Sequence, residues 1–277
     1  MSRNAVIPLI AVPLAFVLAP ALAHGADKPA GVAKLSAAAI VEHNITARGG
    51  QSAWHAVQTL SWAGKMEAGG NNQRYLKAPG MPMPPVNKEP AAQVQLPFTL
   101  EMKRGHKMRL DLQFNGQTAV QVYDGTKGWK VRPFLNRHQV EPYTADEARV
   151  AANEPDIDGL LIDYAGRGTK IDVEGIEQLD GKTAYKLKLT LSNGHVLHDW
   201  VDAQSFLEVK IEGTPRRLDG RLHPVAIHLR DYRNVGGVQI PHLIETTVQG
   251  VERTERIVIE KATVNPRLDD SRFAKPA

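Results

Sequence analysis

Two histidines and an aspartate lie close together in the chain, at His195, His198 and Asp199, in a combination that can bind a metal ion. Side chains bind a metal such as Zn²⁺ only when they converge on one point. We predict a strand over residues 196–202, and residues three apart on a strand point to opposite faces. His195 and His198 therefore diverge, and the chain has no cysteine to complete a ligand set. The sequence predicts neither a metal site nor a cofactor.

Carboxylates are the next candidates, because a pair of them can act as general acid and general base. Asp156 and Asp158 follow Pro155 and are typical of helix caps or loops, while Asp124-Gly125 is typical of a hairpin turn. The chain lacks the G-x-S-x-G, phosphate-loop and H-E-x-x-H motifs of common enzyme classes. We therefore expect a protein that is not an enzyme. The alternative is a hydrolase or carbohydrate-processing protein, which requires an acid pair in a cleft.

Apolar side chains are the third group that could carry a function. Between residues 98 and 131 they alternate with polar ones, as they do in strands with one buried and one wet face. Each buried methylene contributes ~0.8 kcal/mol, so moving one long acyl chain through water costs on the order of 10 kcal/mol without a shield. We predict that one sheet face provides this shield and binds the ligand through Leu100, Met102, Leu110, Leu112, Phe114, Val120, Val122, Trp129 and Val131. The alternative is an ordinary core filled by the protein's own helices.

Antiparallel strands are the elements that would carry these side chains. Apolar–polar alternation recurs from Leu60 to Phe273, and Asn115-Gly116, Asp180-Gly181 and Asn193-Gly194 are typical turns between strands. The pattern predicts a mainly β fold with an antiparallel sheet that is strongly curved on itself. Strands are expected at about residues 59–67, 98–102, 110–114, 120–122, 129–131, 170–176, 184–191, 196–202, 206–213, 225–233, 240–249 and 252–264.

Short helices are expected to cover the concave face of this sheet. Ser36 is a typical N-cap, and the helix that follows ends at Gly49-Gly50. Its apolar stripe consists of Ile40, Val41 and Ile45. A second short helix over residues 52–57 directs Trp54 inward.

Two longer segments interrupt the strand pattern. Residues 143–168 favour helix at 145–152 and then contain Pro155, which predicts two short helices or a lid over apolar surface. Residues 68–95 are rich in Pro, Gly and Asn. Proline removes a hydrogen-bond donor from a strand ladder, so this segment is predicted to be an inserted loop or flap and not a central strand.

The first 23 residues are predicted to be a signal peptide. Arg3 provides a positive start, residues 5–18 are uncharged and apolar, and Ala21-Leu22-Ala23 is a typical cleavage site. The apolar run contains two prolines and is shorter than the ~20 residues that span a bilayer. An uncleaved membrane anchor is the alternative. We expect residues 24–277 to form a single mature domain.

The absence of cysteine and the small net charge limit the covalent modifications and the binding partners that we expect. An exported chain without cysteine has neither disulfides nor a lipidated cysteine at its cleavage site. The net charge of +4 is small, and the basic residues are spread along the strands, so nucleic acid is not an expected partner. We predict a periplasmic protein that is soluble after cleavage of the signal near Ala23.

Several short motifs follow one another in a recognisable order. Gly49-Gly50 ends the first helix, and residues 122–125 precede Gly128-Trp129. Residues 175–187 lead into residues 200–202, and the chain continues with residues 231–241, Val264-Asn265-Pro266 and Phe273. In this order the chain resembles the LolA/LolB-like superfamily, and within it the wider group of outer-membrane lipoprotein-sorting proteins. The resemblance covers most of the mature chain.

The resemblance implies an incomplete β-barrel with helices in its mouth and an apolar cavity for the acyl chains of a lipoprotein or another lipid. It also implies that an arginine, Arg48, Arg104 or Arg109, anchors a lid carbonyl or a lipid headgroup. We therefore expect a periplasmic carrier with a possible inner- or outer-membrane protein partner. An envelope sensor or interaction module that uses the same fold without lipid transfer is the alternative. The insertion at 68–95 departs from the compact carriers of this superfamily.

Overall fold

One antiparallel sheet dominates the computed structural model, which describes residues 33–69, 93–133, 136–218, 220–251 and 254–277. Its strands are β1 (Thr59–Gly69), β2 (Gln93–Lys103), β3 (Lys107–Phe114), β4 (Gln117–Asp124), β5 (Gly128–Arg132), β6 (Arg137–Pro142), β7 (Lys170–Leu179), β8 (Lys182–Thr190), β9 (Val196–Asp202), β10 (Glu208–Leu218), β11 (Arg221–Val235), β12 (Val238–Val248) and β13 (Glu255–Val264). The helices are α1 (Ala37–Ala47), α2 (Gln51–Ala56), α3 (Ala145–Asn153) and the short 3₁₀ helix η2 (Asp270–Phe273).

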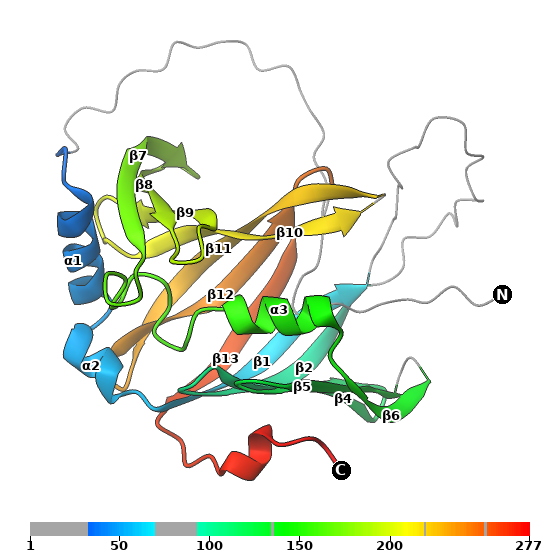
Figure 1. Ribbon diagram of the computed structural model, residues 1–277. Helices are drawn as coiled ribbons and strands as arrows, with labels where there is room; N and C mark the ends of the chain where they lie inside the picture. The colour runs from blue at the N-terminus through cyan, green and yellow to red at the C-terminus, as the bar shows by residue number, and fades with distance from the viewer. Residues whose placement is uncertain (1–32, 70–92, 134–135, 219, 252–253) are drawn as a thin grey trace, which may run out of the picture.

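The strand order is β6-β5-β4-β3-β2-β1-β13-β12-β11-β10-β9-β8-β7. Almost every strand pairs with its neighbour in the sequence, and only the pairing of β1 with β13 joins the two ends of the chain. The sheet curls strongly but does not close, so β6 and β7 are its two edges (Figure 1). This arrangement confirms the predicted mainly β, strongly curved antiparallel sheet, an incomplete β-barrel with short helices.

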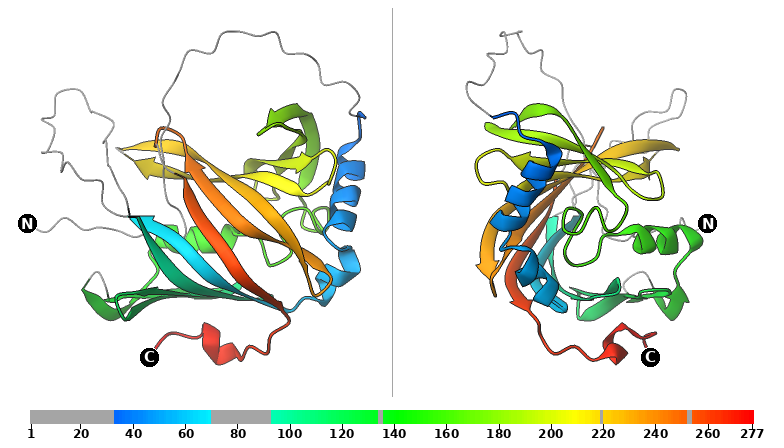
Figure 2. Two further views of the ribbon diagram at one scale, coloured as in Figure 1. Left: turned by 180° about the vertical axis from the view of Figure 1, so that it is seen from behind. Right: turned by 60° about the vertical axis from the view of Figure 1, so that its left-hand side comes forward.

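The connection between β6 and β7, residues 143–169, joins the two edges of the sheet, and we call it the connector. It contains α3 and then a series of turns, and it passes across the inside of the curve (Figure 2). Thr144 and Glu147 form a capping box at the start of α3. The helix predicted at 145–152 is confirmed, whereas the rest of the connector has turns in place of a second helix.

The two glycines between α1 and α2 bring the helices onto the sheet. α1 begins at its predicted N-cap, where Ser36 Oγ accepts a hydrogen bond from Ala39 N at 3.2 Å. Gly49 has a φ of +112°, and a Cβ there would lie 2.2 Å from Gly237 O in the β11–β12 turn. Only glycine permits both this backbone conformation and this close approach. The α1–α2 turn is thereby fixed against the sheet.

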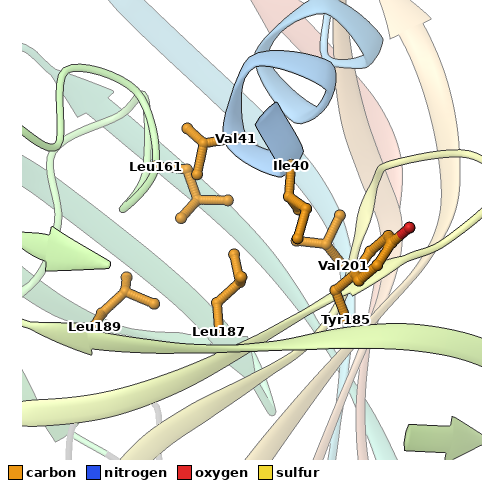
Figure 3. Close-up of a cluster of buried hydrophobic side chains, with 7 residues drawn as sticks. All are labelled: Ile40, Val41, Leu161, Tyr185, Leu187, Leu189 and Val201. Atoms are coloured by element: carbon orange, nitrogen blue, oxygen red, sulfur yellow. The ribbon is translucent and has the colours of Figure 1, made fainter. Parts of the chain in front are cut away.

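Apolar side chains from α1 and the connector pack against the strands β8 and β9. Figure 3 shows Ile40 and Val41 of α1 and Leu161 of the connector facing the sheet. The strand side chains of this buried cluster are Tyr185, Leu187, Leu189 and Val201. Trp54 of α2 is buried in a neighbouring cluster, as predicted. The helices therefore form part of the core and do not lie loosely on the sheet.

Some predicted boundaries need correction. The strand β6 was not predicted, because Arg137–Pro142 lacks a clear alternation of buried and exposed residues. β1 extends to Gly69 and β2 begins at Gln93, so both ends of the predicted 68–95 insertion belong to paired strands. The centre of that insertion and the predicted signal peptide, residues 1–23, lie outside the described residues.

Candidate functional site on the concave face

The two faces of the sheet differ in what they contact. Lys130 on β5 forms an ion pair with Glu147 of α3, which lies inside the curve (Figure 2). Lys130 therefore points to the concave face. Residues that pair directly across neighbouring strands share a face, so this face also contains Gln121, Leu110, Leu100 and Trp62. On the other face, Arg272 of η2 lies 2.8 Å from Glu101 of β2. The C-terminal segment thus covers the convex face.

The nine predicted lining residues divide between these two faces, so the expectation of one shared face is wrong. The concave face carries Leu100, Met102, Leu110, Leu112 and Phe114, and the convex face carries Val120, Val122, Trp129 and Val131. Val122 lies opposite Arg109, which donates from Nη1 to the carbonyl oxygen of Arg272 in η2 at 3.3 Å. Val122 is fully buried there. The four convex-face residues therefore do not line the hollow of the sheet.

Sequence reasoning missed apolar residues from the other half of the concave face. One row across the sheet contains Leu229, Ile244, Ile257 and Met66, and a second contains Ile211 and Ile227. Most of them are only partly buried. Their strands alternate as clearly as those of the first half, so the signal was present in the pattern. The register that joins the strands into one face was the missing information.

Among the described residues, the concave face is filled at one end and incompletely covered at the other. At one end α1 and α2 pack against the sheet, and a cluster around Trp54, Leu60 and Ile240 is almost completely buried. At the end away from α1, the buried residues Met66, Phe98, Leu110 and Ile259 are flanked by side chains that stay partly exposed, namely Trp62, Leu100, Met108, Leu112, Ile244 and Ile257. An ordinary core thus accounts for the first end.

Arginine side chains hold the connector against the helices. Arg48 donates from Nη1 to the carbonyl oxygen of Asp158 at 2.9 Å. Arg104 donates to Asp158 Oδ2 at 2.9 Å and to the carbonyl oxygen of Trp54 at 2.7 Å. Arg48 thus contacts a carbonyl of the predicted lid, as the resemblance implies. Arg109 lies on the convex face and contacts the C-terminal segment instead.

Lys130 and Glu147 fix the other end of the connector. The Lys130 side chain is buried, and its ammonium group donates to both carboxylate oxygens of Glu147. Burial alone would raise the pKa of Glu147, but hydrogen bonds from Lys130 and from the backbone of Thr144 outweigh it and lower the pKa. Glu147 therefore stays ionised. The Tyr143 ring also stacks on Tyr123 of β4, with 6.4 Å between centroids.

A buried acid pair lies next to Arg48. Asp199 of β9 is 0% exposed and Glu208 of β10 is 4% exposed, and Glu208 lies 3.4 Å from Arg48 Nη1. Burial, reinforced by the neighbouring Glu208, raises the pKa of Asp199 well above its usual value. Tyr232 donates its hydroxyl to the carbonyl oxygen of Glu208 at 3.0 Å, and burial raises its pKa too. Both acids are sealed from solvent, so the pair lacks the access that a hydrolase requires.

The histidines considered as metal ligands have carboxylate partners of another kind. His198 lies on β9 with Nδ1 2.6 Å from Glu212 and Nε2 3.2 Å from Glu174, whereas His195 belongs to the preceding turn. No group of three His, Cys, Asp or Glu side chains that could hold a metal occurs in the described part of the chain. Within the same described ranges, no helix is long and apolar enough to cross a membrane.

Comparisons with known proteins place the fold. By sequence, the chain matches no family model and no curated protein. By structure, it is similar to a LolA superfamily protein from Nitrosomonas europaea, with a TM-score of 0.52, 16% identity and coverage of 87% of this chain and 98% of that one. A putative outer membrane lipoprotein-sorting protein domain from Vibrio parahaemolyticus matches with a TM-score of 0.52, 10% identity and coverage of 86% and 95%. A DUF1329 family protein from Desulfovibrio piger matches with a TM-score of 0.51, 13% identity and coverage of 86% and 96%.

Proposed function

The chain has a LolA-like fold, and we propose that it is a non-enzymatic periplasmic binding and transfer protein. It holds the acyl chains of a lipoprotein or another lipid against the concave face of its sheet. In this proposal residues 1–23 direct export and residues 24–277 form the mature protein. The printed names of two structural neighbours, a LolA superfamily protein and an outer membrane lipoprotein-sorting domain, support a role with lipids or lipoproteins.

One observation carries the proposal. Apolar residues from several strands line one face inside the curve, yet at the end away from α1 they remain only partly buried. A protein interior normally packs its apolar side chains to high density. Partly exposed apolar residues on an inward-facing surface therefore favour a surface that a hydrocarbon ligand completes.

The expected affinity follows from the hydrophobic effect. Burying ten methylenes of an acyl chain contributes roughly 8 kcal/mol before the entropic cost of binding is subtracted. A dissociation constant of 1 μM corresponds to about 8 kcal/mol. Because association itself costs about 4 kcal/mol or more, micromolar binding of a single acyl chain requires burial of about fifteen methylenes, and two chains on one lipid would bind more tightly.

The direct test is to identify lipid bound to protein purified gently from its own periplasm. Mass spectrometry of the denatured sample is expected to detect co-purified lipid, and the lipid-free protein is expected to take up a fluorescent acyl chain. A wild-type protein that carries no lipid and takes up no acyl chain would reject the proposal.

A pair of matched variants locates the binding surface. Ile244→Asp places a charge on the concave face, and Val258→Asp places the same charge on the convex face of the adjacent strand β13, where Val258 is 38% exposed. We expect Ile244→Asp to abolish acyl-chain uptake and Val258→Asp to leave it unchanged. Thermal unfolding of both variants checks that the sheet is intact. Equal uptake by the two folded variants would place the ligand elsewhere.

A further inference from the structure

Arg216 of β10 and Glu255 of β13 approach each other across the sheet, with Arg216 Nη2 3.8 Å from Glu255 Oε2. The strands β11 and β12 lie between β10 and β13. Neighbouring strands are about 4.8 Å apart, so the two backbones are separated by roughly 14 Å measured along the sheet. The side chains can meet only by reaching over β11 and β12 on the inside of the curve. The register agrees, because Glu255 lies opposite Thr246 on the concave face.

Both side chains are deeply buried and poorly satisfied. Arg216 and Glu255 are each 7% exposed. None of the three guanidinium nitrogens of Arg216 has a hydrogen-bond partner, and neither does Glu255 Oε1. The separation of 3.8 Å is longer than a hydrogen bond. A buried charged group without hydrogen bonds is costly. No residue in the described part of the chain supplies a hydrogen-bond acceptor to the guanidinium group of Arg216.

Another buried arginine of the concave face provides a comparison. Arg132 on β5 is 3% exposed, and its Nε and Nη1 also lack partners. Its Nη2, however, donates to Glu141 Oε2 at 2.5 Å. The charge of Arg132 is therefore neutralised within the protein, whereas the one carboxyl group among the described residues that pairs with Arg216, that of Glu255, lies too far away for a hydrogen bond.

The electrostatic environment leaves Arg216 as a net positive charge at neutral pH. Burial raises the pKa of Glu255 to about 8, despite the attraction of Arg216. Burial lowers the pKa of Arg216 to about 10, which still leaves it protonated at pH 7. The partner of the arginine is thus mostly neutral, and an anion would complete the site.

The cation lies at the end of the apolar face described above. Glu255 is two residues before Ile257 on the same strand and the same face, and its partner Thr246 lies opposite Ile227. A ligand with an anionic group beside Arg216 could therefore lay its hydrocarbon chain over Ile227, Ile244 and Ile257. Guanidinium groups bind phosphates and carboxylates through paired hydrogen bonds.

We propose that Arg216 binds the anionic head group, a phosphate or a carboxylate, of an amphiphile whose chain lies on the concave face. The inference rests on the proposed function, and it narrows the ligand to an anionic lipid. The same chemistry would also suit free inorganic phosphate, so the test must separate the two sources.

The experiment compares two ligands that differ only in the phosphate. 1-Oleoyl lysophosphatidic acid and 1-oleoylglycerol have the same acyl chain and glycerol, and each is titrated against the lipid-free full-length mature protein. The wild type is expected to bind the phosphate-bearing ligand about ten- to a hundredfold more tightly, the range expected for hydrogen bonds to a charged group. Inorganic phosphate is titrated separately and as a competitor.

Variants assign the preference to one residue. Arg216→Met removes the guanidinium but keeps an apolar side chain of similar length, and we expect it to abolish the preference while 1-oleoylglycerol binds as before. Arg132→Met is the matched control, because its charge is already neutralised, and the preference is expected to persist. Thermal unfolding of each variant verifies the fold.

The possible results separate this inference from the proposed function. If the wild type binds both ligands equally well, or if folded Arg216→Met keeps the preference, the anion site is overturned and acyl-chain binding stands. If neither ligand binds, both proposals fail. Inorganic phosphate could also bind on its own and displace labelled lysophosphatidic acid as effectively as the unlabelled lipid does. The site would then recognise a free anion, and the amphiphile inference would be wrong.

Discussion

Glu255 allows a direct measurement of how strongly burial on the concave face raises the pKa of a carboxyl group. The substitution Glu255→Gln keeps the size and shape of the side chain but removes its titration. In the folded protein the pKa of Glu255 is raised from 4.5 to about 8, with burial as the main cause. Between these two values the folded protein keeps the proton, whereas the unfolded chain releases it. The free energy of unfolding therefore falls as the pH rises through this window.

The size of the effect follows from the two values. The difference between 4.5 and about 8 corresponds to a change in stability of up to about 5 kcal/mol. This stability is fully present below the unfolded value of 4.5 and is lost as the pH rises to about 8. Above that pH both states are ionised at Glu255 and the contribution stays constant. Glu255→Gln lacks this contribution at every pH.

The assay is urea denaturation of the wild type and of Glu255→Gln at several pH values from 4.5 to 8, the two values of Glu255. Other titrating groups, including the buried Asp199, are common to both proteins and cancel in the difference. We expect the wild type to lose several kcal/mol more than the variant over this range. Parallel pH profiles for the two proteins would show that the pKa of Glu255 is not raised by burial. The argument that Arg216 is a buried cation without a charged partner would then fail as well.

Two glycine contacts give further predictions. Gly49→Ala should destabilise the protein more than Gly50→Ala. Both glycines have a positive φ, but only a Cβ at Gly49 would meet a backbone atom, Gly237 O at 2.2 Å, and strained positions of this kind cost roughly 1–3 kcal/mol. Chemical denaturation measures the stability of both variants, and equal losses would contradict the contact. Gly128→Ala places a Cβ 2.0 Å from the Tyr143 ring and should displace the start of the connector. Limited proteolysis is expected to cut the connector faster in Gly128→Ala, and Tyr143→Ala in the same chain should reverse the effect.

The local elements could be predicted from the sequence because each depends on neighbouring residues. At Asn115-Gly116 both residues have a positive φ, 48° and 73°, as expected for a two-residue hairpin turn. The strand at 196–202 and the N-cap at Ser36 also agree with the structure. β6 was missed because an edge strand with one weakly buried face shows little apolar alternation. Fold class was accessible for the same reason, since a long series of hairpins leaves few alternatives to a curved meander.

The site was harder, because it depends on how strands combine. Alternation shows that Leu110 and Leu112 share a face, and that Val120 and Val122 share a face, but not that the two pairs lie on opposite sides. The Asn115-Gly116 turn contained that information: a two-residue loop pairs Phe114 with Gln117 and hence Asp111 with Val120. The contact between Arg216 and Glu255 was beyond this kind of reasoning, because it depends on the curvature of four strands.

The topology also explains why one end of the concave face is packed while the described residues leave the other end incompletely covered. The connector must join the two sheet edges, and its contacts with Arg48 and Arg104 bring it against α1 and α2. Leu161 and Ile162 of the connector then complete the buried clusters beneath these helices. At the other end the β10–β11 and β12–β13 hairpins extend away from α1 and α2 (Figure 1), and no described helix contributes a side chain to the cluster around Met66. The poorly satisfied charge of Arg216 lies at that same end, which is where an amphiphile would place its head group.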